Sequence, residues 1–276
     1  LTKEGAVIPF RKPLGALDYL DQKQYIKNME IISFLPDVSI SSGEPLMAMW
    51  AKGAQRLLPA GGAGWMDVSD PRKPTVVSVK GGVSGCVAYN TRLKKWLMVK
   101  SAGQPNSSPR PGEFPNGQFD EGLLKEVRSY KGLRGIRVYD ITDPISPRLL
   151  NEFSTGETGT GTHMNFYDGG RYAYLEAGFT DQLIFDNSGR ASSNALMIVD
   201  LWDPEKVAEV SRWHFPGQLV GEESERRKYW WAGSQAAWSG SHGAATVPIR
   251  VEDGGTVGYG GFGHYGMVIF DLTDIK

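Results

Sequence analysis

The residues best suited to chemistry are histidines, of which the 276-residue chain has four. Two of them, His163 and His242, stand at matching points, each ahead of a segment that leads to an Asp-Gly-Gly turn. Neutral imidazole nitrogens are good ligands for borderline and transition metals. If the two segments belong to repeated units around one axis, both side chains reach the same end of that axis. The spacing therefore predicts a metal site with His163 and His242 as ligands; alternatively, each caps a strand or contacts a neighbouring unit.

Other residues could complete such a site. His264, within Gly-His-Tyr-Gly, is a candidate third ligand or catalytic acid or base. Glu176 follows the His163 turn and is a candidate general base or a partner of the ligands. Cys86 occupies a related position and is either a soft ligand or a buried structural thiol. The metal could be copper, iron, manganese or zinc, and the ligand types alone do not choose among them.

A repeated strand motif supplies the elements that would position these residues. An apolar run ends in an Asp, two further residues and a second Asp, at intervals of about 60 to 75 residues. The Asp pairs are Asp67 and Asp70, Asp140 and Asp143, Asp200 and Asp203, and Asp271 and Asp274. Asp carboxylates in such turns accept hydrogen bonds from backbone amides a few residues further on. We therefore expect these aspartates to be structural corners and not catalytic groups.

A second hairpin precedes the motif in two copies. Asp168–Gly170 and Asp253–Gly255 predict tight turns with a strand on each side. The unit then has four strands, and four-stranded units repeated around an axis are typical of β-propeller blades. The predicted fold is an all-β propeller of which this chain supplies about four blades, with short helical insertions. Residues 1–30 are expected to form an N-terminal extension and residues 31–276 the blades.

Two copies of the motif resemble a known family. Residues 197–200 (Met-Ile-Val-Asp) and 138–144 (Val-Tyr-Asp-Ile-Thr-Asp-Pro) are similar to the repeats of the bacterial β-propellers named for an LVIVD-type sequence. The resemblance covers roughly residues 30–276 and implies a bacterial propeller. More distantly, the layout is similar to selenium-binding-protein-like and thiocyanate-dehydrogenase-like propellers, whose axial histidines hold copper. That likeness implies oxidation chemistry.

The fourth copy of the motif stops at Lys276, whereas the earlier copies continue into another strand. About four blades are also few for a closed propeller. We therefore expect a second polypeptide segment to complete the ring. Residue 1 is Leu without a signal-peptide pattern behind it, which favours a processed or trimmed chain.

Composition limits the partners. The formal net charge is −1 without a basic stripe, which argues against nucleic acid. An apolar run of about 18 residues is missing, so we expect no membrane span. The single cysteine excludes an intrachain disulfide and leaves periplasmic, secreted and cytoplasmic locations open.

Three insertions leave two functions open. They cover residues 104–134, 179–194 and 217–240, with helices expected at 119–130 and 222–229. Their aromatic residues could cap a substrate channel, cover a blade edge or form a subunit interface. One function is a metal-dependent enzyme acting on a small organic substrate, with an oxidoreductase favoured over a hydrolase or lyase. The other is a non-catalytic propeller that serves as a binding platform or scaffold.

Overall fold

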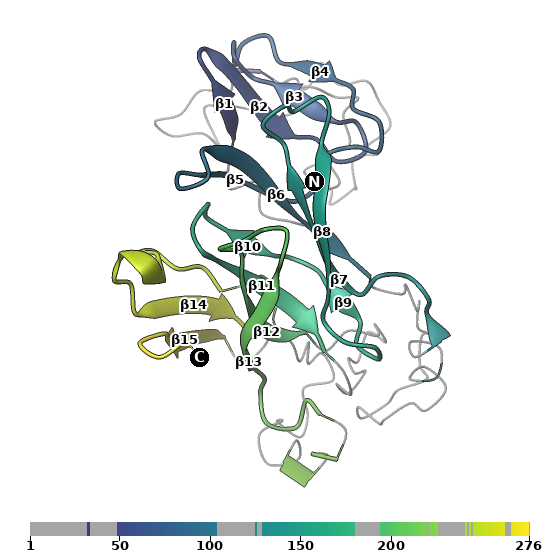
Figure 1. Ribbon diagram of the computed structural model, residues 1–276, viewed down its shortest axis with the longest axis vertical. Coiled ribbons are helices and arrows are strands. Elements are labelled where there is room, and N and C mark those ends of the chain that lie inside the picture. The colour runs from purple at the N-terminus through teal and green to yellow at the C-terminus, as the bar shows by residue number, and fades with distance from the viewer. Residues whose placement is uncertain are drawn as a thin grey trace, which may run out of the picture.

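The chain folds into antiparallel β-sheets in the computed structural model (Figure 1). The structure describes residues 32–33, 49–103, 125, 129–179, 194–219, 221–222, 224–225, 241, 243, 245–262 and 266–275. The predicted all-β class is confirmed. Most of the three insertions, together with the helices expected there, lies outside the described residues, as does the expected N-terminal extension.

Four sheets follow one another along the described part of the chain. The first contains β1 (Trp50–Lys52), β2 (Gln55–Pro59), β3 (Trp65–Asp67) and β4 (Thr75–Val77). The second contains β5 (Cys86–Asn90), β6 (Lys95–Ala102), β7 (Gly135–Asp140) and β8 (Arg148–Ser154). The third contains β9 (Gly161–Thr162), β10 (Phe166–Tyr167), β11 (Tyr172–Gly178), β12 (Ala195–Asp200) and β13 (Ala208–Trp213). The fourth contains β14 (Val257–Gly261) and β15 (Met267–Asp271).

The second and third sheets repeat the same local irregularity. A β-bulge lies between Val138 and Tyr139 in the pairing of β7 with β8, and another between Ile198 and Val199 in the pairing of β12 with β13. In each sheet the bulge comes just before the first Asp of the motif. Because bulges bend and twist a strand at a defined residue, the two sheets share one shape as well as one sequence pattern.

The aspartates form corners, as the sequence predicts. For seven of the eight aspartates the carboxylate accepts a hydrogen bond from the backbone amide two residues later. The pairs are Asp67 with Ser69 (2.9 Å), Asp70 with Arg72 (3.0 Å), Asp140 with Thr142 (3.0 Å), Asp143 with Ile145 (3.1 Å), Asp200 with Trp202 (2.7 Å), Asp203 with Glu205 (3.1 Å) and Asp271 with Thr273 (2.9 Å). The expected structural role of these residues is confirmed.

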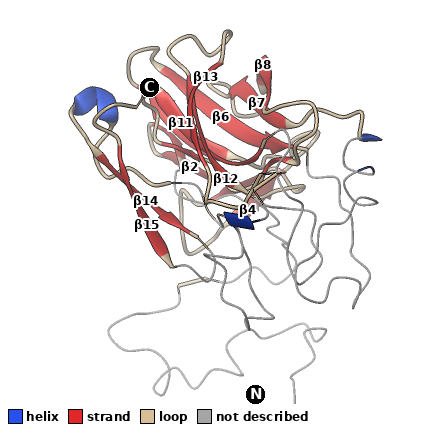
Figure 2. Ribbon diagram, turned by 90° about the horizontal axis from the view of Figure 1, so that it is seen from below, coloured by secondary structure: helices blue, strands red, loops and turns tan. Residues whose placement is uncertain are grey.

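Successive sheets pack face to face in chain order. Trp50, Leu57 and Trp65 of the first sheet cluster with Val87 and Met98 of the second. A second apolar cluster joins the second and third sheets, and a third joins the third and fourth. The described residues thus form an open row, with β1–β4 at one end and β14–β15 at the other (Figures 1 and 2).

One predicted strand is wrong. The segment before Asp253–Gly255 was expected to be extended, but Val251–Asp253 forms the short 3-10 turn η1. Among the described residues before η1, Thr246 alone forms a bridge to β14, at Tyr259. Two residues further on is Pro248, which has no amide hydrogen and so cannot continue the hydrogen bonding to β14. An ion pair between Arg250 and Asp253 at 2.8 Å closes the turn instead.

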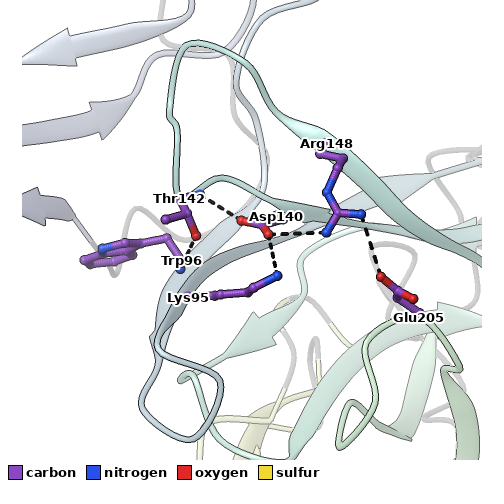
Figure 3. Close-up of polar contacts among 6 residues, drawn as sticks. All are labelled: Lys95, Trp96, Asp140, Thr142, Arg148 and Glu205. Atoms are coloured by element: carbon purple, nitrogen blue, oxygen red, sulfur yellow. Dashed lines mark hydrogen bonds and ion pairs between the residues drawn. The ribbon is translucent and has the colours of Figure 1, made fainter.

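Asp140 is part of a network of ion pairs that reaches the third sheet through Arg148 (Figure 3). Its carboxylate lies 2.9 Å from the Lys95 ammonium and 3.5 Å from the Arg148 guanidinium, which also lies 3.7 Å from Glu205 beyond the third sheet's corner. Burial alone would raise the pKa of Asp140, but hydrogen bonds from Thr142 and Lys95 outweigh it and lower the pKa to about 2.

Asp140→Asn should lower the free energy of unfolding at pH 7 by about 1 to 2 kcal/mol, because the amide keeps the turn but loses both ion pairs. A carboxyl whose pKa falls on folding stabilises the fold above its unfolded value of 3.8, and this contribution is lost as the pH falls through about 2. The difference between the two proteins should therefore shrink below pH 4 in urea titrations. Asp143→Asn, which keeps an acceptor for the Ile145 amide, is the matched control. Equal stability of Asp140→Asn and the wild type at pH 7 would contradict this account.

Candidate functional site

His163 lies where the first strand of the third sheet is interrupted. β9 and β10 pair with opposite ends of β11, and residues 163–165 between them leave the ladder. The His163 amide still donates to the Glu176 carbonyl at 3.0 Å, and its own carbonyl accepts a hydrogen bond from the Ser101 hydroxyl. Interruptions of this kind turn a side chain away from its usual direction and often adjoin functional sites.

The Glu176 carboxylate lies fully buried beneath this interruption. Its Oε1 accepts a hydrogen bond from Asn194 Nδ2 at 2.6 Å. Its Oε2 accepts one from the Met164 amide at 3.2 Å and one from the Gly243 amide at 2.7 Å. Three N–H donors therefore satisfy a carboxylate that burial alone would make very unfavourable.

These contacts bring the two matched histidine segments together. Met164 directly follows His163 in the sequence, and Gly243 directly follows His242. One oxygen of Glu176 therefore binds the amide that follows each histidine. The sequence predicts that both histidines reach one end of a common axis; the contacts of Met164 and Gly243 show that the residues after the two histidines both bind Glu176. His242 and His264 themselves lie outside the described residues, so their roles as ligand and as ligand or acid/base stay predictions.

Asn194 makes a second connection that the sequence did not indicate. Besides its bond to Glu176, its carbonyl accepts hydrogen bonds from the Ser241 amide at 2.8 Å and from Gln218 Nε2 at 3.2 Å. Its side-chain Oδ1 is buried and has no hydrogen-bond partner within the described part of the chain. Asn194 is the last residue of a polar insertion. Its position just before an apolar strand is the only feature of the sequence that could have identified it.

Burial raises the pKa of Glu176 to about 7, although the hydrogen bonds from Gly243, Asn194 and Met164 act in the opposite direction. The group therefore changes its charge close to neutral pH. Both of its oxygens are occupied by N–H donors, which leaves it poorly placed to bind a metal directly. Its geometry favours the predicted role of a partner that holds the ligands over that of a general base.

Of the predicted imidazole ligands, His163 is the one that lies within the described residues. His163 is half-buried at the interruption, and a neutral imidazole suits copper, zinc or iron. Within the residues that the structure describes, three or more His, Cys, Asp or Glu side chains do not gather into one metal-binding group. A complete site would therefore need His242, His264 or groups from elsewhere.

Cys86 fits the structural alternative. Its buried Sγ lies 3.2 Å from both the amide and the carbonyl of Tyr167, so it bridges the second and third sheets. A thiol held in this way packs and hydrogen-bonds between sheets. The geometry therefore favours a buried structural thiol over a soft metal ligand.

No protein-family model matches the sequence, and no curated protein matches it either. In the described part of the chain, helices long and apolar enough to cross a bilayer do not occur.

The variant Glu176→Gln should remove the charge at position 176 while keeping groups that can form its hydrogen bonds. In Glu176→Gln the side-chain oxygen can accept from Met164 and Gly243, while its amide donates to Asn194 Oδ1 once the Asn194 amide group turns over. We expect this variant to fold. A carboxyl whose pKa rises on folding contributes stability below its unfolded value of 4.5, and that contribution is lost as the pH rises through about 7. The wild type should therefore lose roughly 3 kcal/mol between pH 4.5 and 8 that Glu176→Gln does not lose.

Urea titrations at pH 5 and pH 8 measure this difference. Glu176→Ala leaves three buried donors without a partner and should be destabilised by about 3 kcal/mol or more at both pH values. Parallel pH profiles for the wild type and Glu176→Gln would show that Glu176 does not titrate in this range.

Proposed function

We propose that this chain forms blades of a metal-dependent β-propeller enzyme with its site at the segments of His163 and His242. The single observation that carries the proposal is the buried carboxylate of Glu176, which binds the amide after each of the two histidines. Burying a carboxylate at this junction costs free energy. Holding the two ligand segments in place is a function that would explain why the carboxylate is there.

The propeller architecture is supported by the order of the sheets. Each has antiparallel strands in sequence order, and each packs on the next along the chain. Because the described sheets form an open row, the ring would be completed by a second polypeptide segment. In a closed ring the first strand of every sheet lines the central axis. His163 stands at the interruption of that strand in the third sheet.

In this proposal His163 and His242 hold a transition metal, and His264 is a third ligand or an acid/base group. Bound there, the metal would supply Lewis-acid or redox chemistry to a small organic substrate. Glu176 and Asn194 are positioning residues that fix the two segments without touching the substrate. The resemblance to copper-holding propellers favours oxidation over hydrolysis or elimination.

A second candidate is a non-catalytic binding platform, which a cavity at the far end of β10 and β11 favours. The cavity measures about 110 Å³ and is lined in part by Arg92, Arg171, Trp202 and Glu252. Arg92 stacks on the exposed Trp202 ring with its guanidinium 4.1 Å from the ring centre. Such a charged and aromatic hollow could bind a polar ligand without any reaction.

Metal content distinguishes the two candidates. Elemental mass spectrometry of natively purified protein, with copurifying polypeptides retained, should find a transition metal in stoichiometric amount. His163→Ala and His242→Ala should each lose most of it, because each removes one of few ligands, while the melting temperature changes little.

His214→Ala is the matched control. His214 follows β13, its Nδ1 lies 3.2 Å from the Phe215 carbonyl, and it belongs to neither matched segment. Its replacement should leave the metal in place. A folded, complete assembly without metal would refute the enzyme and favour the binding platform.

A further inference from the structure

The fourth sheet has one apolar face that no described part of the chain covers. Met267 and Ile269 of β15 are 66% and 61% exposed, and Val257 and Tyr259 of β14 are exposed beside them. The register places Tyr259 opposite Ile269, so these side chains share one face of the sheet. We call these four residues the β14–β15 face. Large apolar side chains gathered in this way commonly mark an interaction site.

The other face of the same sheet is already in use. Phe270 packs with Phe166, Tyr174 and Leu196 of the third sheet. Gly258 and Gly260 alternate with the exposed residues of β14 and let this inner face lie close to its neighbours. The β14–β15 face therefore points away from the row of sheets, at the end of the molecule (Figures 1 and 2).

A comparison of equivalent motif positions in the other sheets indicates which contact the β14–β15 face lacks. Counted back from the first Asp of each motif, Ile269 corresponds to Val138 and Ile198, and Met267 corresponds to Ile136 and Leu196. Val138 and Ile136 are fully buried in the cluster shared with the third sheet, and Leu196 and Ile198 are buried in the cluster shared with the fourth. In both cases these positions contact the following sheet. The exposed residues of β15 thus occupy the positions that bind the next sheet in the row.

The first sheet carries the surface that would complement the β14–β15 face. By the same count Met66 corresponds to Val199 and Phe270, which contact the preceding sheet. Among the described residues Met66 has no preceding sheet to contact, and it lies with Leu58 and the exposed Val76 on the outward side of β2–β4. One chain thus carries both halves of a sheet-on-sheet contact, at opposite ends of the row.

We propose that the β14–β15 face packs on the first sheet of a second copy of this chain. The proposal rests on the propeller part of the proposed function and identifies the completing polypeptide. Two copies related by a two-fold axis satisfy both ends at once, because each fourth sheet meets the other copy's first sheet and the arrangement closes. Four sheets from each copy give a ring of eight, which lies within the usual range for propellers.

The mass in solution tests this proposal directly. Size-exclusion chromatography with light scattering should give twice the chain mass of 30.3 kDa. Ile269→Lys should raise the dissociation constant of the dimer at least about tenfold, because it places an ammonium in an apolar contact. Ile145→Lys is the matched control, since Ile145 is also exposed (51%), in a corner of the second sheet. That variant should remain dimeric.

Crosslinking tests which faces meet. Two differently tagged chains, one with Met66→Cys and the other with Ile269→Cys, should form a mixed disulfide, and two chains with Ile145→Cys should not. A monomeric wild type, or a dimer that Ile269→Lys leaves intact, would overturn the proposal. Copurification of a different polypeptide that Ile269→Lys releases would also overturn it, by assigning the face to that partner. A dimer without metal would refute the proposed enzyme function but not the proposed dimer. A monomer that contains metal would refute the proposed dimer but not the enzyme function.

Discussion

The fold depends on sheets that are apolar on both faces. All seven residues of β11 are buried, and β12 is buried except at its final Asp. A strand without a polar side needs cover above and below, so the third sheet has to lie between two others. The apolar rows on its two faces pack against different sheets, the second and the fourth. Stacking in chain order is thus a direct consequence of burial, and the Asp corners only set where each strand ends.

Because β11 is buried on both faces, a charged residue within it needs a specific explanation. Glu176 stands between Leu175 and Ala177 in an otherwise uncharged strand. A buried carboxylate is tolerated only when donors surround it, and three surround this one. Gly243 and the interruption at residues 163–165 are each held by a hydrogen bond from a backbone amide to that group. The positions of both segments are therefore tied to the stability of the sheet beneath them.

Local features were predictable from the sequence, and contacts between distant residues were not. The strands, the Asp corners and the turn at Asp168–Gly170 follow from period-two apolar patterns and turn chemistry within a few residues. The 3-10 turn η1 was missed because Pro248 outweighs the strand pattern. Glu176 was selected only as a residue near the end of a strand. Its partner Gly243 is 67 positions away and Asn194 is 18 away, and no spacing rule relates them.

The choice of Glu at position 176 bears on the two candidate functions. A glutamine there could accept from Met164 and Gly243 and donate to Asn194 Oδ1, but only if the Asn194 amide turns over, so that its Nδ2 loses the hydrogen bond to residue 176. As a purely structural link, glutamine would therefore serve about as well as glutamate. What glutamate alone adds is a negative charge that is partly present at neutral pH and grows when a cation lies nearby. A negative charge beside the two histidine segments is what the proposed metal site would use, and the proposed binding platform does not require it.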